Sequence, residues 1–219
     1  MPTILCIETS SAICSVAIIH QGAIYTSKST KSQAHAEILA NLIQDNLKDA
    51  GIQIKDLQAI AISEGPGSYT GLRIGTSTAK GLCFALGIPL IPISTLKIIA
   101  RAALEMGEWE LIWPMMDARR MEVYHCVFNR QLNALSTVEN GIITDEGFRP
   151  AIVTNDTLLC GDGAPKASEI LHLPVADVHA DAATMCLLAE DMYIAGKFAD
   201  LEGFEPFYLK QANITSSKK

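Results

Sequence analysis

Two acidic residues and two glycine-rich turns are the features of this sequence whose types and positions could do chemistry. Glu8 ends a short apolar run over residues 3–7, and Asp117 ends another over residues 111–116. A glycine-rich turn follows a later apolar run in each half. Carboxylates can organise a metal ion or water, and glycine lets a backbone approach a phosphate closely. The candidates for nucleotide or anion binding are therefore Glu8, Gly65, Gly67, Ser68, Asp117, Gly161 and Gly163.

The most distinctive stretch is GPGSYTGLRIG, over residues 65–75. Gly65 and Gly67 permit positive φ angles and Pro66 fixes one dihedral angle, so a strand can turn sharply into a helix here. The start of that helix would offer free N–H groups and positive dipole charge to an anion. No Gly-Lys-Ser/Thr triplet follows, so the stretch is not a Walker phosphate loop. The alternative is a plain strand-to-helix turn without a ligand.

Amphipathic helices are predicted over residues 34–50 and 70–86. The first repeats apolar residues at helical spacing. The second places Gly71, Gly75 and Thr78 on one face, although each glycine in a helix costs about 1 kcal/mol relative to alanine. We expect something to approach this backbone closely, either the neighbouring helix or another subunit.

Histidine, cysteine and serine residues show no spacing typical of a catalytic or metal site. A metal pair that begins at His35 needs a second histidine four residues later, and Leu39 stands there. No Gly-x-Ser-x-Gly motif supports hydrolase chemistry. The six cysteines form no CxxC pair and are expected to be buried free thiols. We predict no catalytic residue, no metal ligand and no intrinsic cofactor.

The elements that must position these residues are predicted in two similar halves, each with a three-strand meander and a later strand that ends in a glycine-rich turn. The meander strands span 3–7, 13–19 and 23–26 in the first half, and 111–116, 121–128 and 135–138 in the second. Further strands are expected at 57–62 and 90–93, and a short one within 153–160, and further helices are expected at 95–106 and 184–195.

This repetition predicts an α/β fold of the duplicated actin-like and sugar-kinase-like (ASKHA) type. Two domains, each with a mixed sheet flanked by helices, would enclose a nucleotide-sized cleft. We expect the N-terminal domain to span residues 1–106, with the partner helices, and a shorter C-terminal domain to span residues 107–219.

Composition excludes several classes of protein. The 219 residues carry a net charge of −7, with 49% hydrophobic and 19% charged residues, which argues against disorder and coiled coils. The acidic balance argues against a chain that holds nucleic acid alone, and the longest internal basic cluster is Arg119-Arg120. The apolar run at 12–19 is far shorter than the roughly 20 residues that span a bilayer. We therefore expect a cytoplasmic chain without membrane association.

Several motifs together resemble those of the TsaB (YeaZ) family. They are ILCIETS at 4–10, SVA at 15–17, the stretch at 65–75, Lys80-Gly81, DARRMEVY at 117–124, GDG at 161–163 and Pro206-x-Tyr208-Leu209. The resemblance covers nearly the whole chain and implies the same ASKHA fold. It implies a non-catalytic subunit of the complex that forms N6-threonylcarbamoyladenosine in ANN-decoding tRNAs, at the adenosine just 3′ of the anticodon. There the chain would scaffold and activate the TsaD transferase.

The resemblance also implies partners. They are TsaD, the catalytic paralogue, and the ATPase TsaE, with tRNA held only through the complex and ATP or ADP possible at the complex interface. Alone, the chain is expected to form a homodimer through the surface that binds TsaD. That interface is expected to contain His35, Ile38, Leu39, Leu42, Ile43, Gly71, Leu72, Gly75 and Thr78.

Two other function classes remain open, namely a small-molecule kinase or carbamoyl transferase of this fold, and a peptidase, which is an older label for the family. The catalytic paralogue carries a His-x-x-x-His metal pair, whose second ligand is replaced here by Leu39. The family usually has Asp where this chain has Glu8. Both departures weaken a metal-dependent reaction, and an assay of phosphate transfer or nucleotide hydrolysis on the pure chain distinguishes these classes.

Overall fold

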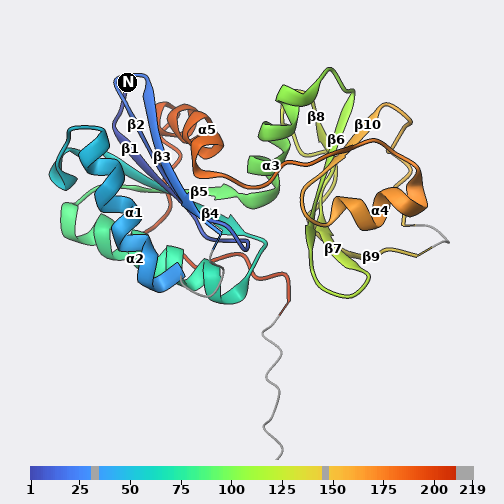
Figure 1. The fold of residues 1–219 in the computed structure, drawn as a ribbon, viewed down its shortest axis with the longest axis horizontal. Helices are drawn as coiled ribbons and strands as arrows, with labels where there is room; N and C mark the ends of the chain where they lie inside the picture. The colour runs from blue at the N-terminus through green and yellow to red at the C-terminus, as the bar shows by residue number, and fades with distance from the viewer. Residues whose placement is uncertain (31–34, 145–147, 211–219) are drawn as a thin grey trace, which may run out of the picture.

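The computed structural model describes residues 1–30, 35–144 and 148–210, which form two α/β lobes side by side (Figure 1). The sheet of the first lobe has the order β3-β2-β1-β4-β5. Its central strand β1 pairs antiparallel with β2 and parallel with β4, so a meander is extended by parallel strands. The strands are β1 (Ile4–Glu8), β2 (Cys14–His20), β3 (Ala23–Ser29), β4 (Ala59–Gly65) and β5 (Leu90–Ser94).

The second sheet repeats this arrangement in the order β9-β7-β6-β10-β11. Here β6 takes the place of β1, because it pairs antiparallel with β7 and parallel with β10. The repetition confirms the predicted duplicated α/β fold of ASKHA type. The strands are β6 (Leu111–Asp117), β7 (Glu122–His125), β8 (Phe128–Asn129), β9 (Glu139–Ile142), β10 (Thr157–Cys160) and β11 (Val175–Ala176).

The second meander differs from the prediction in two places. The strand expected over 121–128 divides into β7 and β8, which pair with opposite ends of β6. The third strand is β9 rather than residues 135–138, because Leu135 donates its N–H to Val127 O within a loop. The chain therefore reaches the free edge of β7 only after this loop.

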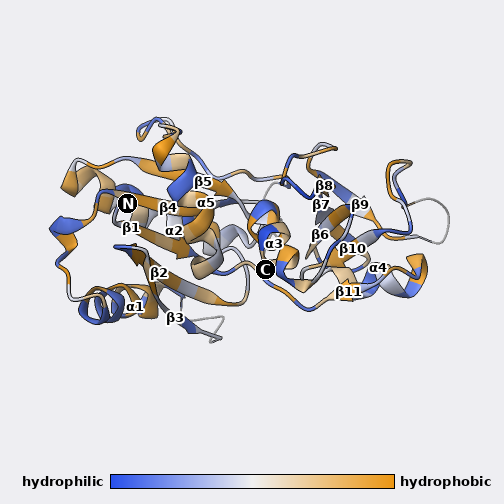
Figure 2. Ribbon diagram, turned by 90° about the horizontal axis from the view of Figure 1, so that it is seen from above, coloured by the Kyte–Doolittle hydropathy of each residue, from blue (hydrophilic) through white to orange (hydrophobic). Residues whose placement is uncertain are grey.

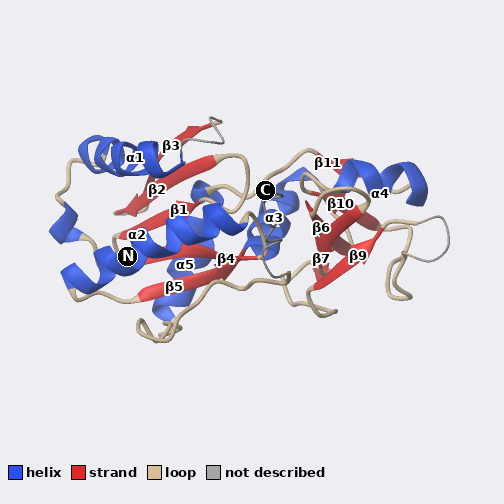
Figure 3. Cartoon of the chain, turned by 90° about the horizontal axis from the view of Figure 1, so that it is seen from below, coloured by secondary structure: helices blue, strands red, loops and turns tan. Residues whose placement is uncertain are grey.

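Helices cover both faces of the first sheet (Figure 3). Two of them, α1 and α2, enclose one core with the sheet, whereas α3 and α5 lie on the other face. The helices are α1 (His35–Asp49), α2 (Tyr69–Leu86), α3 (Thr95–Ala103), α4 (Ala164–Leu171) and α5 (Ala182–Ile194), with 3₁₀ turns at Ile54–Asp56 and Leu104–Met106. Helix α4, directly after the glycine turn at 161–163, had no counterpart in the prediction.

Helix α5 belongs to the segment that the sequence assigned to the second domain, yet it packs against β1 and β2 of the first lobe. Apolar residues lie all round this helix, which is the pattern of a buried helix rather than a surface one. The N–H of Ala182 at its first turn donates to Ser15 Oγ at 3.0 Å. The boundary near residue 106 thus separates the two sheets, but the chain crosses back to the first lobe before it ends.

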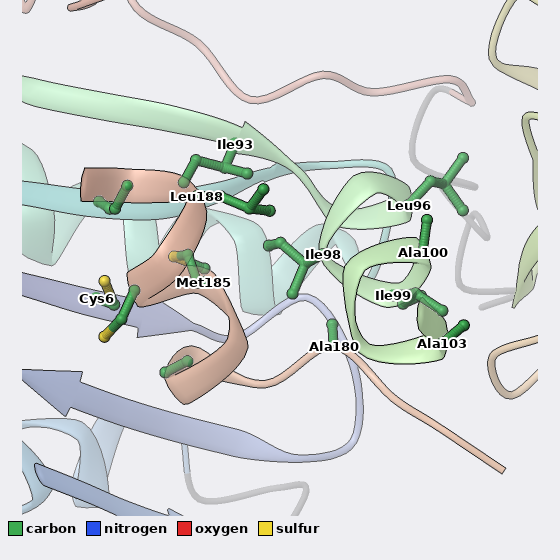
Figure 4. Close-up of a cluster of buried hydrophobic side chains, with 14 of the residues drawn as sticks. Cys6, Ile93, Leu96, Ile98, Ile99, Ala100, Ala103, Ala180, Met185 and Leu188 are labelled. Carbon is green, nitrogen blue, oxygen red and sulfur yellow. The ribbon is translucent and has the colours of Figure 1, made fainter. Parts of the chain in front are cut away.

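The buried hydrophobic residues of the described chain form three clusters. One lies between the first sheet and α1 and α2, and another between the second sheet and α4. The third surrounds α3 and joins both lobes, with Ile98, Ile99 and Met185 among its members (Figure 4). Strands β1, β2 and β4 are accordingly mostly hydrophobic (Figure 2). Among the described helices, none has the length and apolar character needed to cross a bilayer.

The glycines of α2 face the chain's own backbone. A Cβ at Gly71 would overlap the carbonyl oxygen of Thr9, and a Cβ at Gly75 would overlap the hydroxyl oxygen of Thr9. That hydroxyl donates to Gly71 O at 2.8 Å. The close approach expected at these glycines is therefore made by the loop after β1, which the sequence did not indicate, and not by a neighbouring helix.

We predict that Gly71→Ala lowers the free energy of unfolding by about 1–3 kcal/mol, because the added methyl group overlaps the Thr9 backbone. Gly81→Ala is the matched control in the same helix. A Cβ there meets no atom of the described residues within 4 Å, so this exchange should raise stability by up to about 1 kcal/mol. Urea unfolding followed by circular dichroism measures both variants, and equal stabilities would contradict the assigned contact.

Candidate functional site

A cleft of about 1330 Å³ lies between the two lobes, where β1 and β6 end. This space is large enough for a nucleotide, since small-molecule pockets measure about 300–1,000 Å³. The cleft is lined by residues 10–12, 66–71, 116–120 and 207–210, together with His35, Ala36, Ile74, Glu122, Tyr124 and Asp162.

The wall from the first lobe forms where β1 and β4 end and α2 begins. The hydroxyl of Ser68 caps α2 by accepting the N–H of Gly71 at 3.3 Å. The N–H of Ser68 donates to Ser10 O at 2.7 Å. A Cβ at Gly67 would lie 2.5 Å from that same oxygen, so only glycine fits there. The loop after β1 and the first turn of α2 therefore form one continuous surface along the cleft.

A buried imidazole lies beside this wall. His35, the first residue of α1, is 4% exposed, and its Nε2 lies 3.1 Å from Ser11 O. Its Nδ1 has no hydrogen-bond partner within the described residues. Most buried polar atoms are paired with protein or ordered water. This ring nitrogen is therefore a buried polar atom beside the cleft that is unpaired among the described residues.

The wall from the second lobe is a tight turn between β6 and β7. Asp117 Oδ1 accepts the N–H of Arg119 at 2.6 Å and the ammonium of Lys166 at 2.6 Å. Lys166 also donates to Arg120 O at 2.8 Å. Arg119 and Arg120 both have left-handed backbone conformations, with φ of 71° and 56°, which are unfavourable for residues other than glycine. Asp117 and Lys166 thus hold a turn that places two exposed arginines on the cleft.

The charges of the cleft suit an anion better than a cation. The carboxylates that line it are already engaged, because Asp162 accepts the N–H of Asp117 at 2.9 Å and Glu122 forms an ion pair with Lys210. Asp117 itself is paired with Lys166. The two arginines and the positive end of α2 remain on opposite walls. Phosphate groups are the usual ligands of such an arrangement.

Aromatic side chains form the rim on the α2 side. The rings of Tyr69 and Tyr208 are 4.8 Å apart, and the guanidinium of Arg73 lies 5.2 Å from the centre of the Tyr69 ring. Tyr124 lines the cleft from the second lobe. Planar rings of this kind can stack on a base or on another aromatic group. The site therefore combines a cationic region with aromatic surface.

Three of the seven predicted nucleotide or anion candidates line the cleft, namely Gly67, Ser68 and Asp117. Glycines 65, 161 and 163 lie outside the lining of the cleft, and each allows the backbone to pack closely against a neighbouring segment. Gly65 has φ 118° and lies against the carbonyl oxygen of Phe207, and Gly161 has φ 93° and lies against the backbone of Met115.

The expectation that Glu8 faces the cleft is corrected by the structure. Its side chain is fully buried on the face of β1 that carries Ile4 and Cys6. Oε1 accepts the N–H of Ser10 at 2.6 Å, and Oε2 has no partner in the described part of the chain. Burial raises the pKa of this carboxyl to about 7, although the hydrogen bond from Ser10 opposes the shift. Glu8 therefore does not line the cleft; its side chain holds the loop after β1 through the hydrogen bond from Ser10.

The predicted interface residues fall into two groups. One group is buried within the first lobe, and it contains His35, Leu39, Ile43, Gly71, Leu72 and Gly75. The other group is half-buried on the outer side of α1 and α2, and it contains Ile38, Leu42 and Thr78. The first group packs the two helices against the rest of the lobe, and the second group has more of its side-chain surface accessible to a partner.

Sequence reasoning did not select the arginines, tyrosines and lysine that shape the cleft. Arg119 and Arg120 were visible as the longest internal basic cluster, directly after the strand that ends at Asp117, and this position was a usable signal. Tyr208 and Lys210 reach the cleft only because the C-terminal segment returns to the first lobe, and local pattern gives no sign of that path.

The structure also shows where the cysteines lie and whether the described side chains form a metal-binding cluster. All six cysteines are buried free thiols, as predicted. Across the ranges that the structure describes, no group of three or more His, Cys, Asp or Glu side chains is placed to hold a metal ion.

Several known proteins similar to this chain are named for tRNA threonylcarbamoyladenosine biosynthesis. Residues 25–184 match the family model TsaD, described as tRNA N6-adenosine threonylcarbamoyltransferase. The chain is 30% identical to the tRNA threonylcarbamoyladenosine biosynthesis protein TsaB of Escherichia coli, over 94% of both chains. It is 36% identical to the protein of that name from Haemophilus influenzae, over 56% of this chain and about half (52%) of the relative.

Solved structures from Pseudomonas aeruginosa have the same fold over nearly all of this chain. One, described as YeaZ, superposes with a TM-score of 0.85 at 28% identity and covers 95% of this chain and 100% of that chain. Another, described as an uncharacterized protein with similarity to peptidase YEAZ, has a TM-score of 0.87 at 27% identity, with coverage of 96% and 100%.

We predict that Glu8 makes stability depend on pH. Its pKa in the folded chain is about 7, above the ordinary value of 4.5, so the folded state binds the proton more tightly than the unfolded state. Stability should therefore fall as pH rises from 4.5 to about 7, by up to about 3 kcal/mol from this group.

Glu8→Gln removes this titration. Urea unfolding at pH 5 and pH 8 should show the variant gaining stability over the wild type as the pH rises. A difference between the two proteins that is the same at both pH values would show that Glu8 does not titrate in this range.

Proposed function

The chain belongs to the TsaB (YeaZ) family of tRNA threonylcarbamoyladenosine biosynthesis proteins, and we propose that it is the non-catalytic subunit that binds and activates the TsaD transferase. The product is N6-threonylcarbamoyladenosine, just 3′ of the anticodon in ANN-decoding tRNAs. In this proposal the chain acts in the cytoplasm and forms a homodimer without TsaD. TsaE joins the assembly, and tRNA is held only by the complex.

The observation that carries this proposal is the outer surface of α1 and α2. Phe84 of α2 is 85% exposed, and Ile38, Leu42 and Ile74 are half-buried with part of each side chain packed against the core of the first lobe. A Cβ at Gly81 would meet no atom of the described residues within 4 Å, so none of them accounts for a residue that costs about 1 kcal/mol in a helix. Exposed apolar surface beside a position that allows close backbone approach is typical of a protein interface.

A separate catalytic activity is less well supported. Leu39, where a second metal-binding histidine would stand, is 2% exposed within the core. Glu8 lies behind the cleft wall, and Asp117 is occupied by Lys166 and by the N–H of Arg119. A kinase, carbamoyl transferase or peptidase of this fold needs an available acid, metal ligand or nucleophile near its substrate. These contacts favour a binding role for the cleft.

We also propose that the cleft binds ATP or ADP when the complex has assembled. Arg119 and Arg120 on one wall and the first turn of α2 on the other would hold the phosphates, and the Tyr69 ring offers a surface for the base. This ligand serves assembly in our account and takes no part in bond formation on this chain.

The isolated chain should form no threonylcarbamoyladenosine when it is incubated with tRNA, threonine, bicarbonate and ATP. Addition of TsaD and the remaining components should produce the modified nucleoside, and omission of this chain should lower the yield at least tenfold. Mass spectrometry of digested tRNA measures the product. Modification by the pure chain alone would refute the non-catalytic role.

Phe84→Asp should weaken binding to TsaD and self-association at least tenfold, because the interface would bury an unpaired carboxylate. The matched control is Ile194→Asp, which changes a 75% exposed residue of α5 on the other face of the sheet and should leave both affinities unchanged. Calorimetric titration and analytical ultracentrifugation measure the affinities. The surface assignment fails if Phe84→Asp binds normally or if Ile194→Asp is the variant that loses binding.

A further inference from the structure

The C-terminal segment is hydrogen-bonded to the first lobe at residues 199–204, before it reaches the cleft. Ala199 donates its N–H to Leu90 O at 2.9 Å. Lys80 of α2 donates to the carbonyl oxygens of Glu202 and Phe204, at 3.1 and 3.0 Å. These bonds guide the segment past β5 and α2 to the end of β4.

The last four described residues, 207–210, then run along the cleft and are named the C-terminal strap here. The N–H of Phe207 donates to Glu64 O at 2.7 Å, next to Gly65. Tyr208 places its ring against Tyr69 at the start of α2. The strap is thus anchored to the first lobe by a backbone bond and a ring contact.

The strap ends on the opposite lobe. The ammonium of Lys210 forms an ion pair with Glu122 Oε2 on β7, and the same oxygen accepts a hydrogen bond from Asn140 at 3.0 Å. Within the described parts of the chain, no other salt bridge joins the two lobes. Glu122 is held by β7 and Asn140 and is therefore a fixed anchor for the lysine.

The other junction between the lobes is apolar and lies at α3. Ile99 of α3 and Met116 of β6 belong to the core that spans both lobes. In Figure 1 this helix is on one side of the junction, and the C-terminal segment passes on the other side. The lobes are thus joined by a packed core at one end of the cleft and by one ion pair at the other end. Such a pair of junctions lets the lobes separate at the ion pair and rotate about α3.

We propose that the C-terminal strap is a reversible latch that sets the opening of the cleft. With Lys210 on Glu122 the lobes are held together and the strap occupies part of the space between them. Release of this ion pair separates the strap from β7, leaves it anchored to the first lobe, and widens the cleft for a phosphate-bearing ligand. The consequence for ligand affinity rests on the proposed nucleotide binding, whereas the latch itself does not.

The charges give the latch a modest strength. The side chains of Lys210 and Glu122 are 40% and 24% exposed, so water and salt screen their attraction. A partly exposed ion pair changes an equilibrium by at most about fivefold. A latch of this strength opens without another protein and closes again, and it weakens at high salt.

Electron-spin distance measurements test the latch without any ligand. Spin labels at Lys28→Cys on β3 and Glu169→Cys on α4 report the separation of the lobes, and the six native cysteines are buried. Labelled chain is diluted with unlabelled chain so that only distances within one molecule are measured. Lys210→Glu, which faces Glu122 with a like charge, should shift the distances to longer and broader values.

Two matched controls show whether loss of the Lys210–Glu122 ion pair causes the longer distances. The double variant Lys210→Glu with Glu122→Lys restores opposite charges and should return the wild-type distances. A chain shortened after Phe207 should resemble Lys210→Glu, whereas a chain shortened after Lys210 should resemble the wild type. Wild-type distances in both Lys210→Glu and the chain that ends at Phe207 would overturn the proposal, as would a failure of the charge exchange to restore them.

Binding of ADP separates the latch from the proposed ligand. The ADP affinities are measured by calorimetry on chain saturated with TsaD, with ADP binding by TsaD alone subtracted, and the chain that ends at Phe207 should bind ADP about fivefold more tightly than the chain that ends at Lys210. Longer distances without ADP binding in any of these complexes would support the latch and refute nucleotide binding by this chain. Equal ADP affinities in the two shortened chains would refute control of access by the strap.

Discussion

The contact of Thr9 with α2 is the constraint on which the rest of this structure depends. Thr9 follows β1 directly, donates its hydroxyl hydrogen to Gly71 O and fills the space over Gly75. This contact fixes the height of α2 above the sheet and brings the N–H of Ser68 to Ser10 O. The first wall of the cleft exists because two glycines let a loop lie directly on a helix.

Helix α2 has an inner side, which packs on Thr9, and an outer side, which does not. Gly71 and Gly75 belong to the inner side, where they are necessary for packing within the lobe. Gly81 and Phe84 belong to the outer side, where a Cβ at Gly81 would meet no atom of the described residues within 4 Å and Phe84 is 85% exposed. A helix that is held firmly from within can present an apolar outer side to a partner without losing its place. The small residues of one helix therefore serve the fold and the proposed assembly separately.

Hydrophobic periodicity predicted most of the elements, because alternation and helical spacing are local properties of the chain. The need for close approach at Gly71 and Gly75 also followed from helix propensity. Its partner did not, since Thr9 lies 62 residues before Gly71. Glu8 was misplaced because the end of an apolar run does not tell which face of the sheet a side chain takes. The return of α5 to the first sheet likewise depends on tertiary packing, which no local pattern contains.

Hydroxyl-radical footprinting of the chain with and without TsaD tests the central claim most directly, that the outer side of α2 is reserved for a partner. Phe84 is 85% exposed and Phe198, near α5, is 44% exposed, so both rings react in the free chain at low concentration. Our account predicts that TsaD lowers oxidation of Phe84 severalfold and leaves Phe198 unchanged. Undiminished oxidation of Phe84 in a saturated complex would contradict it.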